Sequence, residues 1–123
     1  MQLADVVRIH VDQIERYGGP AGIRDLGLLQ SAIAMPQASF DGEWLHRDLY
    51  EMAAAYAFHV SRNHAFTDGN KRTALASALV FLEINGISTQ DPEGRLYETM
   101  IDVVSGVLDK LGLAQVFQGL AGE

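Results

Sequence analysis

Apolar residues recur every three to four positions along most of the chain, which is the spacing of one face of an α-helix. The first such run predicts a helix that ends near Tyr17, where Gly18-Gly19-Pro20 breaks the pattern. A second helix is predicted from about Asp25, whose carboxylate suits an N-cap, to the residue before Pro36.

Two longer helices follow residues 36–43, a segment that is typical of a loop with a turn at Asp41-Gly42. The first is predicted over about residues 45–63 and the second over about residues 70–85, with Gly86 as its stop. The second helix is apolar nearly all round, which predicts a place in the middle of a bundle.

The last third of the chain continues the helical pattern. Residues 87–90 favour a short extended piece, Pro92 suits the first turn of a fifth helix, and a last helix is predicted over about residues 108–120. We therefore expect one all-α domain over residues 1–123, a compact bundle of about six helices around a buried central helix.

Composition narrows the class of protein. At 123 residues with 48% hydrophobic and 20% charged side chains, the chain suits a single globular core. It has no cysteine, which excludes disulfides and thiolate chemistry. It also has no apolar run of the ~18 residues that a membrane span needs, and its opening lacks a basic signal segment. A cytoplasmic protein without membrane contact is the expectation.

Charge argues against one class of partner. Nine Lys and Arg stand against sixteen Asp and Glu, a formal net charge of −7. Proteins that grip nucleic acids through phosphates normally carry the opposite balance, so no direct nucleic-acid binding is expected. A local cationic pocket for one phosphorylated ligand is compatible with this charge.

Candidate chemistry concentrates in residues 64–72, His-Ala-Phe-Thr-Asp-Gly-Asn-Lys-Arg. This segment leads onto the start of the apolar helix, where unpaired N–H groups and the helix dipole favour an anion. Gly69 lets the backbone approach a phosphate closely, and the Asn70 amide can donate to it. Lys71 and Arg72 lie in the first turn, where the dipole disfavours cations, so a bound anion is the expected compensation.

The remaining residues of the segment complete a transfer site. His64 is placed to take a proton from an attacking hydroxyl, and Asp68 is a hard oxygen ligand suited to Mg²⁺. Phe66 is predicted to anchor the loop in the core. Arg62 is a further candidate for the pocket. Together these residues predict a phosphoryl or nucleotidyl transfer site.

Ordinary structural roles compete with each assignment. A single histidine at a helix end is usually a cap, Asp-Gly-Asn is usually a turn, and Lys-Arg is usually solvated; their combination before an apolar helix favours function. His10 lies on the apolar face of the first helix and is predicted to be a packed core residue.

The segment resembles the Fic/Doc family, whose motif is H-P-F-x-(D/E)-G-N-G-R-x-x-R. The matches are His64, Phe66, Asp68, Gly69, Asn70 and Arg72. The departures are Ala65 for Pro, Lys71 for the second Gly and Leu75 for the last Arg, and the last two are typical of Doc toxins. The likeness extends to the flanking runs 16–19 and 29–32.

This resemblance implies an all-helical fold and a toxin of a toxin–antitoxin system. Fic proteins transfer AMP to protein hydroxyls, whereas Doc toxins transfer the terminal phosphate of ATP to a threonine of elongation factor Tu and stop translation. On the family pattern His64 is the base, Asp68 holds Mg²⁺, and residues 69–72 cradle phosphates. Lys71 fills space that Gly leaves for the triphosphate and Leu75 removes a cation, which together favour a reversed nucleotide.

The resemblance also implies a partner and leaves alternatives open. A Phd-like antitoxin, whose tail folds as a helix in a groove of the toxin, is expected. The alternatives are AMP or other nucleotide transfer and a non-catalytic module that only binds an antitoxin. Residues 89–94 fit the self-inhibitory string S/T-x-x-x-E-G/N of some Fic proteins, but Pro92 inside the string favours coincidence.

Overall fold

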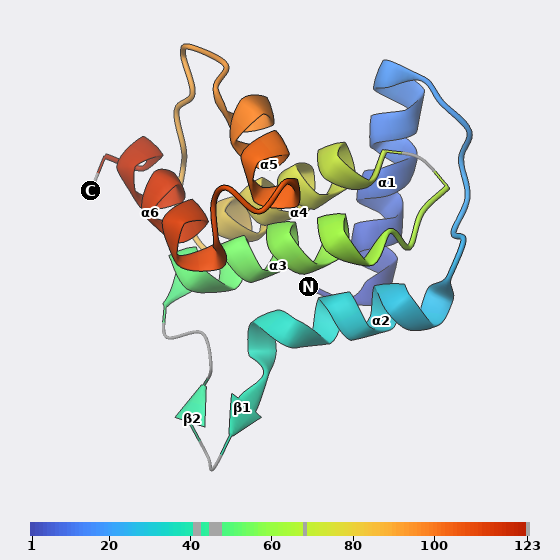
Figure 1. Cartoon of the computed structure of the whole chain (residues 1–123), viewed down its shortest axis with the longest axis horizontal. Helices are drawn as coiled ribbons and strands as arrows, with labels where there is room; N and C mark the ends of the chain where they lie inside the picture. Colours follow the sequence, from blue (N-terminus) through green and yellow to red (C-terminus); the bar gives the residue numbers. More distant parts are fainter. Residues whose placement is uncertain (41–42, 45–47, 68, 123) are drawn as a thin grey trace.

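The computed structural model describes residues 1–40, 43–44, 48–67 and 69–122 and confirms the all-α class (Figure 1). The helices of this described part are α1 (Leu3–Tyr17), α2 (Leu26–Ala34), α3 (Leu49–Asn63), α4 (Asn70–Ile84), α5 (Leu96–Val104) and α6 (Lys110–Leu120). Helices α3 and α4 lie side by side through the middle, with α1 at one end and α6 at the other, while α2 packs along α3 and α5 packs on α4.

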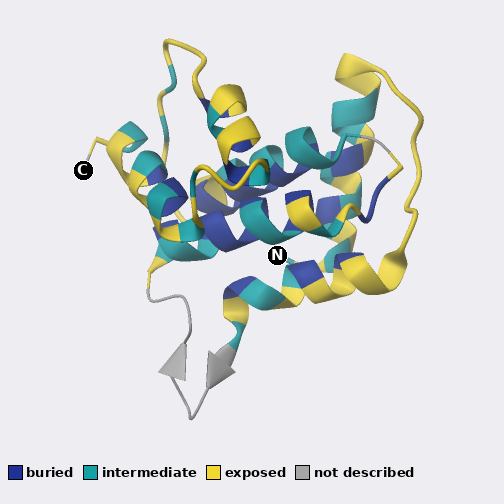
Figure 2. Cartoon of the chain, in the orientation of Figure 1, coloured by how far each residue is buried: buried dark blue, intermediate teal, exposed yellow. Residues whose placement is uncertain are grey.

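The core is built around α3 and α4, as Figure 2 shows. Helix α4 buries one face, including Phe81 and Leu82, but α3 is buried along more of its length. Helix α3 carries several alanines with no exposed surface, namely Ala53, Ala54, Ala55 and Ala57. Their small side chains let neighbouring helices approach closely. The expected central position of the fourth helix is therefore shared with the third.

Aspartate caps set several helix starts. The side chains of Asp25, Asp48 and Asp109 each accept a hydrogen bond from the backbone N–H three residues further on, at 2.7 to 3.0 Å. Asp48 has extended backbone angles, so α3 begins at Leu49, later than the sequence pattern predicted.

Two connections differ from the prediction. Residues 36–43 were expected to form a loop; instead a 3-10 turn (Met35–Gln37) leads into β1 (Ser39–Phe40), which pairs antiparallel with β2 (Glu43–Trp44). The expected turn at Asp41-Gly42 lies outside the described residues.

Pro92 does not begin the fifth helix. It lies in a turn, and α5 begins at Leu96, because the carboxylate of Asp91 accepts hydrogen bonds from the backbone N–H groups of Arg95 and Leu96. Residues 89–94 are accordingly not helical. None of the helices in the described ranges combines the length and the hydropathy of a membrane span.

Candidate functional site

His64 ends α3 in an unusual backbone conformation. Its φ of 48° and ψ of 43° lie in the left-handed region, and it is the one non-glycine residue with positive φ in the described part of the chain. The residue is exposed rather than packed into the core. A left-handed residue turns the chain sharply out of a helix, so the imidazole stands where the motif loop begins.

The motif loop is held by backbone pairing with the segment before α2. The carbonyl of Ala65 accepts hydrogen bonds from the N–H groups of Arg24, at 2.6 Å, and Asp25, at 3.0 Å. The N–H of Thr67 donates to the carbonyl of Gly22 at 3.0 Å. The sequence did not reveal this partnership, because an isolated bridge between positions 23 and 66 leaves no periodic signal.

Phe66 is buried with 1% of its surface exposed and stacks on the ring of His10, with the centroids 3.8 Å apart. His10 also shares a 3.0 Å hydrogen bond between its Nδ1 and Oγ1 of Thr73 on α4. The expectation that His10 is a packed core residue is confirmed. Through this ring, α1 supports the loop and the first turns of α4 together.

Asn70 uses its side chain to close the loop. Its Oδ1 accepts from the N–H of Phe66 and its Nδ2 donates to the carbonyl of Phe66, both at 3.0 Å. The amide was expected to donate to a phosphate; in this structure it is committed to the loop backbone. The Asn70 side chain therefore fixes the loop that leads into α4, so at the helix start Asn70 would bind a phosphate with its backbone N–H rather than with its side-chain amide.

Gly69 is the N-cap of α4 and has a φ of 72° and a ψ of 22°. A left-handed residue followed by right-handed helical ones forms a concave nest of N–H groups that attracts anions. Glycine has no side chain with which to cap the helix start, and the first N–H groups of any α-helix lack an acceptor inside the helix. A Cβ at position 69 would lie 3.3 Å from Ile14 Cδ1 and 3.5 Å from Arg72 Nη2.

Arg72 is fixed beside this nest. Its Nη2 donates to the carbonyl of Gly18 at 3.1 Å, and its guanidinium lies 5.5 Å from the centre of the Tyr17 ring. Its Nε is buried and has no hydrogen-bond partner among the described residues. A held guanidinium with an unsatisfied donor is prepared to accept an anion, because a buried N–H without a partner is costly.

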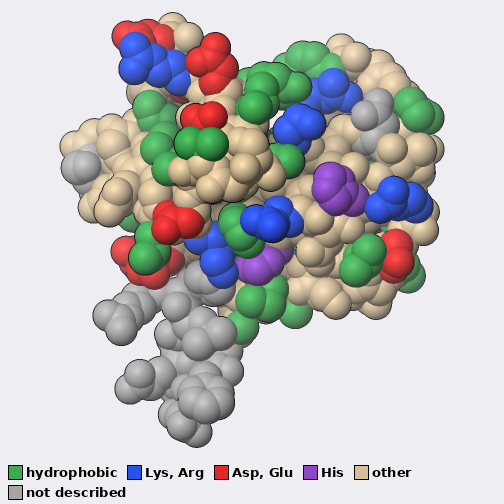
Figure 3. Space-filling model, viewed as in Figure 1, with side chains coloured by type: hydrophobic (Ala, Val, Ile, Leu, Met, Phe, Trp, Pro, Cys, Tyr) green, Lys and Arg blue, Asp and Glu red, His purple; other side chains and the backbone are tan. Residues whose placement is uncertain are grey.

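The other predicted site residues differ in where they lie relative to the start of α4. Lys71 is half-buried in the first turn of α4 and lines the cleft described below. Arg62 is exposed, and its guanidinium lies over the ring of Phe58, 4.9 Å from its centre; it does not line that cleft. Asp68, the predicted magnesium ligand, lies outside the described residues. Figure 3 shows Lys, Arg and His side chains gathered on this face.

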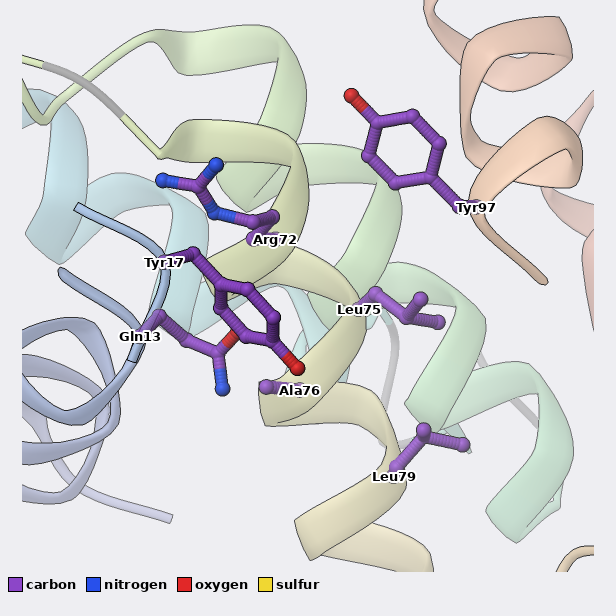
Figure 4. Close-up of a pocket in the computed structure, with 7 residues that line it drawn as sticks. All are labelled: Gln13, Tyr17, Arg72, Leu75, Ala76, Leu79 and Tyr97. Atoms are coloured by element: carbon purple, nitrogen blue, oxygen red, sulfur yellow. The ribbon is translucent and has the colours of Figure 1, made fainter. Parts of the chain in front are cut away.

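Two adjoining clefts open at the start of α4. The smaller, of about 150 Å³, is mostly polar and lined by Thr67, Gly69, Asn70, Lys71, Arg72 and Tyr97. The larger, of about 500 Å³, is mostly apolar and lined by Gln13, Tyr17, Arg72, Leu75, Ala76, Leu79 and Tyr97 (Figure 4).

The clefts share Arg72 and Tyr97, so one ligand can reach from one into the other. A phosphorylated molecule with an apolar or aromatic end suits this pair, with its anion at the nest and its ring between the tyrosines. The sequence did not predict Tyr17 or Tyr97, because tyrosines far apart in the chain carry no local signal.

Known proteins are similar to this chain over much of its length. Residues 1–82 match the sequence model of the Fic/DOC family. The chain is 36% identical over 119 residues to the protein kinase doc of Escherichia phage P1, which covers 96% of this chain and 92% of that protein. It is 49% identical over 71 residues to the toxin Doc of Mycolicibacterium smegmatis, and this match spans 58% of this chain and about half, 55%, of that protein.

Proposed function

The chain belongs to the Fic/DOC family, and on that premise we propose that it is a toxin of a toxin–antitoxin system that transfers the terminal phosphate of ATP to a protein hydroxyl. The relatives named toxin Doc and protein kinase doc support the toxin class and a transferase that acts on proteins. We further propose that it acts in the cytoplasm, on a threonine of a translation protein such as elongation factor Tu.

The observation that carries the proposal is the anion cradle at the start of α4. Gly69 supplies the nest of N–H groups, Arg72 supplies a guanidinium that is already held in place, and Lys71 lines the same cleft. Donors that are fixed before the reaction stabilise charge that develops during transfer without further reorganisation. In this proposal the terminal phosphate lies in the cradle.

His64 is proposed as the general base. The hydroxyl oxygen of the target attacks the terminal phosphorus, the bond from that phosphorus to the bridging oxygen breaks, and ADP leaves. The proton of the hydroxyl passes to the imidazole of His64, which is exposed and therefore accessible to a protein substrate. Arg72 and Lys71 stabilise the negative charge that gathers on the transferred and leaving oxygens.

Magnesium is proposed as the cofactor, held by Asp68. When bound, Mg²⁺ neutralises phosphate charge, and it commonly binds through one or two carboxylates together with the phosphates of a nucleotide. This assignment rests on the residue type and its place next to Gly69 in the sequence.

Transfer of the terminal phosphate is preferred over transfer of AMP because of two positions on α4. Leu75, which stands where AMP-transferring members carry an arginine, lines the larger apolar cleft. An apolar wall there suits a nucleoside better than charged phosphates. With the nucleoside in the larger cleft and Arg72 at the junction, the terminal phosphate would extend toward the motif loop.

An antitoxin similar to Phd is proposed as the regulatory partner. The larger cleft is the groove that an antitoxin helix would compete for, because exposed Tyr17 and Tyr97 border its apolar floor. An antitoxin bound there would exclude the nucleoside. A protein that had kept only this binding role would have no need of the fixed Arg72 or the exposed His64.

The test is incubation of the purified chain with Mg²⁺, elongation factor Tu and ATP labelled on either the terminal or the innermost phosphate. We expect label from the terminal phosphate on the target and none from the innermost phosphate. The variant His64→Asn is the inactive control, since asparagine tolerates the left-handed backbone of this position.

Each other outcome of the labelling experiment would support a different conclusion. Label from the innermost phosphate would assign AMP transfer and overturn the kinase proposal. Absence of label from both, in a preparation that binds ATP, would favour a binding module. Equal labelling by wild type and His64→Asn would exclude His64 as the base.

A further inference from the structure

Cations gather around the motif loop of a chain that is acidic as a whole. We define the cationic band as Arg24, Arg62, Lys71 and Lys110 together with His59 and His64. Figure 3 shows Lys, Arg and His side chains across the middle of one face, with most of its Asp and Glu side chains at the rim. The net charge of the chain is −7, so this concentration is local.

Contacts and positions in the sequence relate several members of the band to one another. Arg24 donates its backbone N–H to Ala65, the residue after His64. Arg62 precedes His64 by two residues at the end of α3, and Lys110 of α6 places its Nζ 3.1 Å from Nε2 of His59. Arg24 and Arg62 are thus both held near the proposed base.

Phe58 forms the centre of one half of the band. The Arg62 guanidinium lies 4.9 Å and the Lys110 ammonium 5.5 Å from the centre of its ring. His59 meets the same ring edge-on at 5.1 Å. Such cation–π contacts fix long cationic side chains in one orientation. Partial burial lowers the pKa of Lys110, as expected for an ammonium group that has given up part of its hydration.

Among the described residues, no ion pair joins a carboxylate to an arginine of the band. The ion pairs of the described residues join Arg16 to Asp12 and Arg95 to Glu93, and neither pair belongs to the band. Asp25, the sequence neighbour of Arg24, uses its carboxylate to cap α2 at the N–H of Leu28.

We propose that the cationic band docks an acidic segment of the protein substrate, with carboxylates at Arg24 and Arg62 and the reactive hydroxyl between them at His64. This inference rests on the proposed function, because it names the chemical class of the segment that the proposed transferase selects. Arg62 lies two residues before the base on α3, and the backbone of Arg24 is held against the residue after it, so a segment that contacts both arginines lies close to His64.

An acidic peptide fits the band better than a nucleic acid. A polyanion with regular phosphates extends well beyond the band and meets the repulsion of a molecule with a net charge of −7. A short peptide carries a few carboxylates that match the few cations, and its apolar atoms can contact the Phe58 ring. Steering of this kind acts mainly on encounter with the target and falls with added salt.

The first test measures binding without catalysis. A fluorescein-labelled peptide in which glutamates flank one threonine is titrated with the full chain at low salt, and its glutamine counterpart serves as the uncharged probe. We expect the variant Arg24→Gln/Arg62→Gln to bind the acidic peptide about three- to tenfold more weakly. Arg8→Gln, an exposed arginine on α1 outside the band, and Arg24→Lys/Arg62→Lys should bind like wild type.

The second test measures transfer to elongation factor Tu. The double glutamine variant should raise KM for the protein by a similar factor and leave KM for ATP unchanged. Equal binding of both peptides, equal binding by the glutamine variant, or tighter binding of a single-stranded oligonucleotide to the same arginines would overturn the docking proposal. Absence of transfer by wild type would instead refute the proposed function, while the peptide titration still decides whether the band docks an acidic segment.

Discussion

At the scale of single residues, the site combines conformational strain with exposure. His64 holds a left-handed backbone, which costs an ordinary side chain about 1–2 kcal/mol and which histidine and asparagine tolerate better than most. Strain of this kind persists where the surroundings fix it, and here the pairing of Ala65 with Arg24 and Asp25 does so.

Replacement of His64 separates its chemical role from its structural one. Both His64→Asn and His64→Ala should lower the rate of transfer by a factor of about 10² to 10⁴, because each removes the proposed proton acceptor. The free energy of unfolding should stay unchanged in the asparagine variant and fall by up to about 1 kcal/mol in the alanine variant, because alanine fits the left-handed region less well. Urea unfolding and initial rates check the two effects, and a wild-type rate in either variant would contradict the role of the base.

Gly69 is needed both for its backbone angle and for the space beside it. Gly69→Ala should lower the free energy of unfolding by about 1–2 kcal/mol and raise KM for ATP by about tenfold, because a Cβ there presses on Ile14 and on the Arg72 guanidinium. Gly86→Ala is the matched control: its φ is 84°, but a Cβ there meets nothing within 4 Å. It should share the loss of stability and keep the KM. Equal effects of the two variants on KM would show that the contact at Gly69 does not matter.

At the scale of elements, α1 and α4 are joined through a side chain that also supports the motif loop. His10 stacks on Phe66 and shares a hydrogen bond with Thr73, so a shift of α1 would move both the loop and the first turns of α4. The geometry of the anion cradle therefore depends on a helix that contributes no predicted catalytic residue.

A double-mutant cycle measures this link. His10→Phe keeps an aromatic ring against Phe66 but removes the partner of the buried Thr73 hydroxyl, so it should destabilise the fold by about 1–3 kcal/mol. Adding Thr73→Val removes the orphaned hydroxyl and should recover about 1 kcal/mol of that loss. Thermal or urea unfolding of the four proteins gives the coupling, and strictly additive effects would argue against the hydrogen bond.

Helices could be predicted from the sequence because their signals are local. Apolar spacing and the capping residues Asp25 and Gly86 located most helix ends within a few residues. The prediction that Pro92 lies in the first turn of the fifth helix was wrong, because the carboxylate of Asp91 holds the chain in a turn and α5 begins only at Leu96. The bridge between positions 23 and 66 is a contact between distant segments and had no local signal.

The site shows the same division between local and distant information. Residues 64–72 were recognisable as a unit, yet the commitment of the Asn70 amide to Phe66 depends on how the loop folds. The position of Arg62 over Phe58 and the tyrosines of the larger cleft depend on helix packing, which spacing along one helix does not specify.

At the scale of the whole molecule, charge and burial have separate consequences for stability. Acidic side chains outnumber basic ones in the chain, and the cationic band lies at the motif loop, whereas the core holds few ionisable groups. The pKa values of Tyr56 and Lys110 shift in opposite directions. Burial raises the pKa of Tyr56 on α3, and desolvation lowers the pKa of Lys110 on α6.

These two shifts make opposite contributions to stability at alkaline pH. The unfolded chain loses the Tyr56 proton at about pH 10, before the folded protein does, so Tyr56 lowers stability as pH rises beyond that value. Lys110 acts the other way, because below about pH 10.5 the unfolded chain holds its proton more tightly and stability gains as pH rises.

The variant Tyr56→Phe removes the contribution of Tyr56 alone. Urea unfolding between about pH 8 and 11 should therefore show a smaller fall, or a larger rise, in the free energy of unfolding of this variant than of wild type. Tyr97→Phe, which removes an exposed hydroxyl, is the matched control. The amino group of Met1 donates to Oη of Tyr56 at 3.1 Å, so Tyr56→Phe should also be less stable at neutral pH. A pH slope identical to that of wild type would mean that burial of Tyr56 does not govern the alkaline stability of the fold.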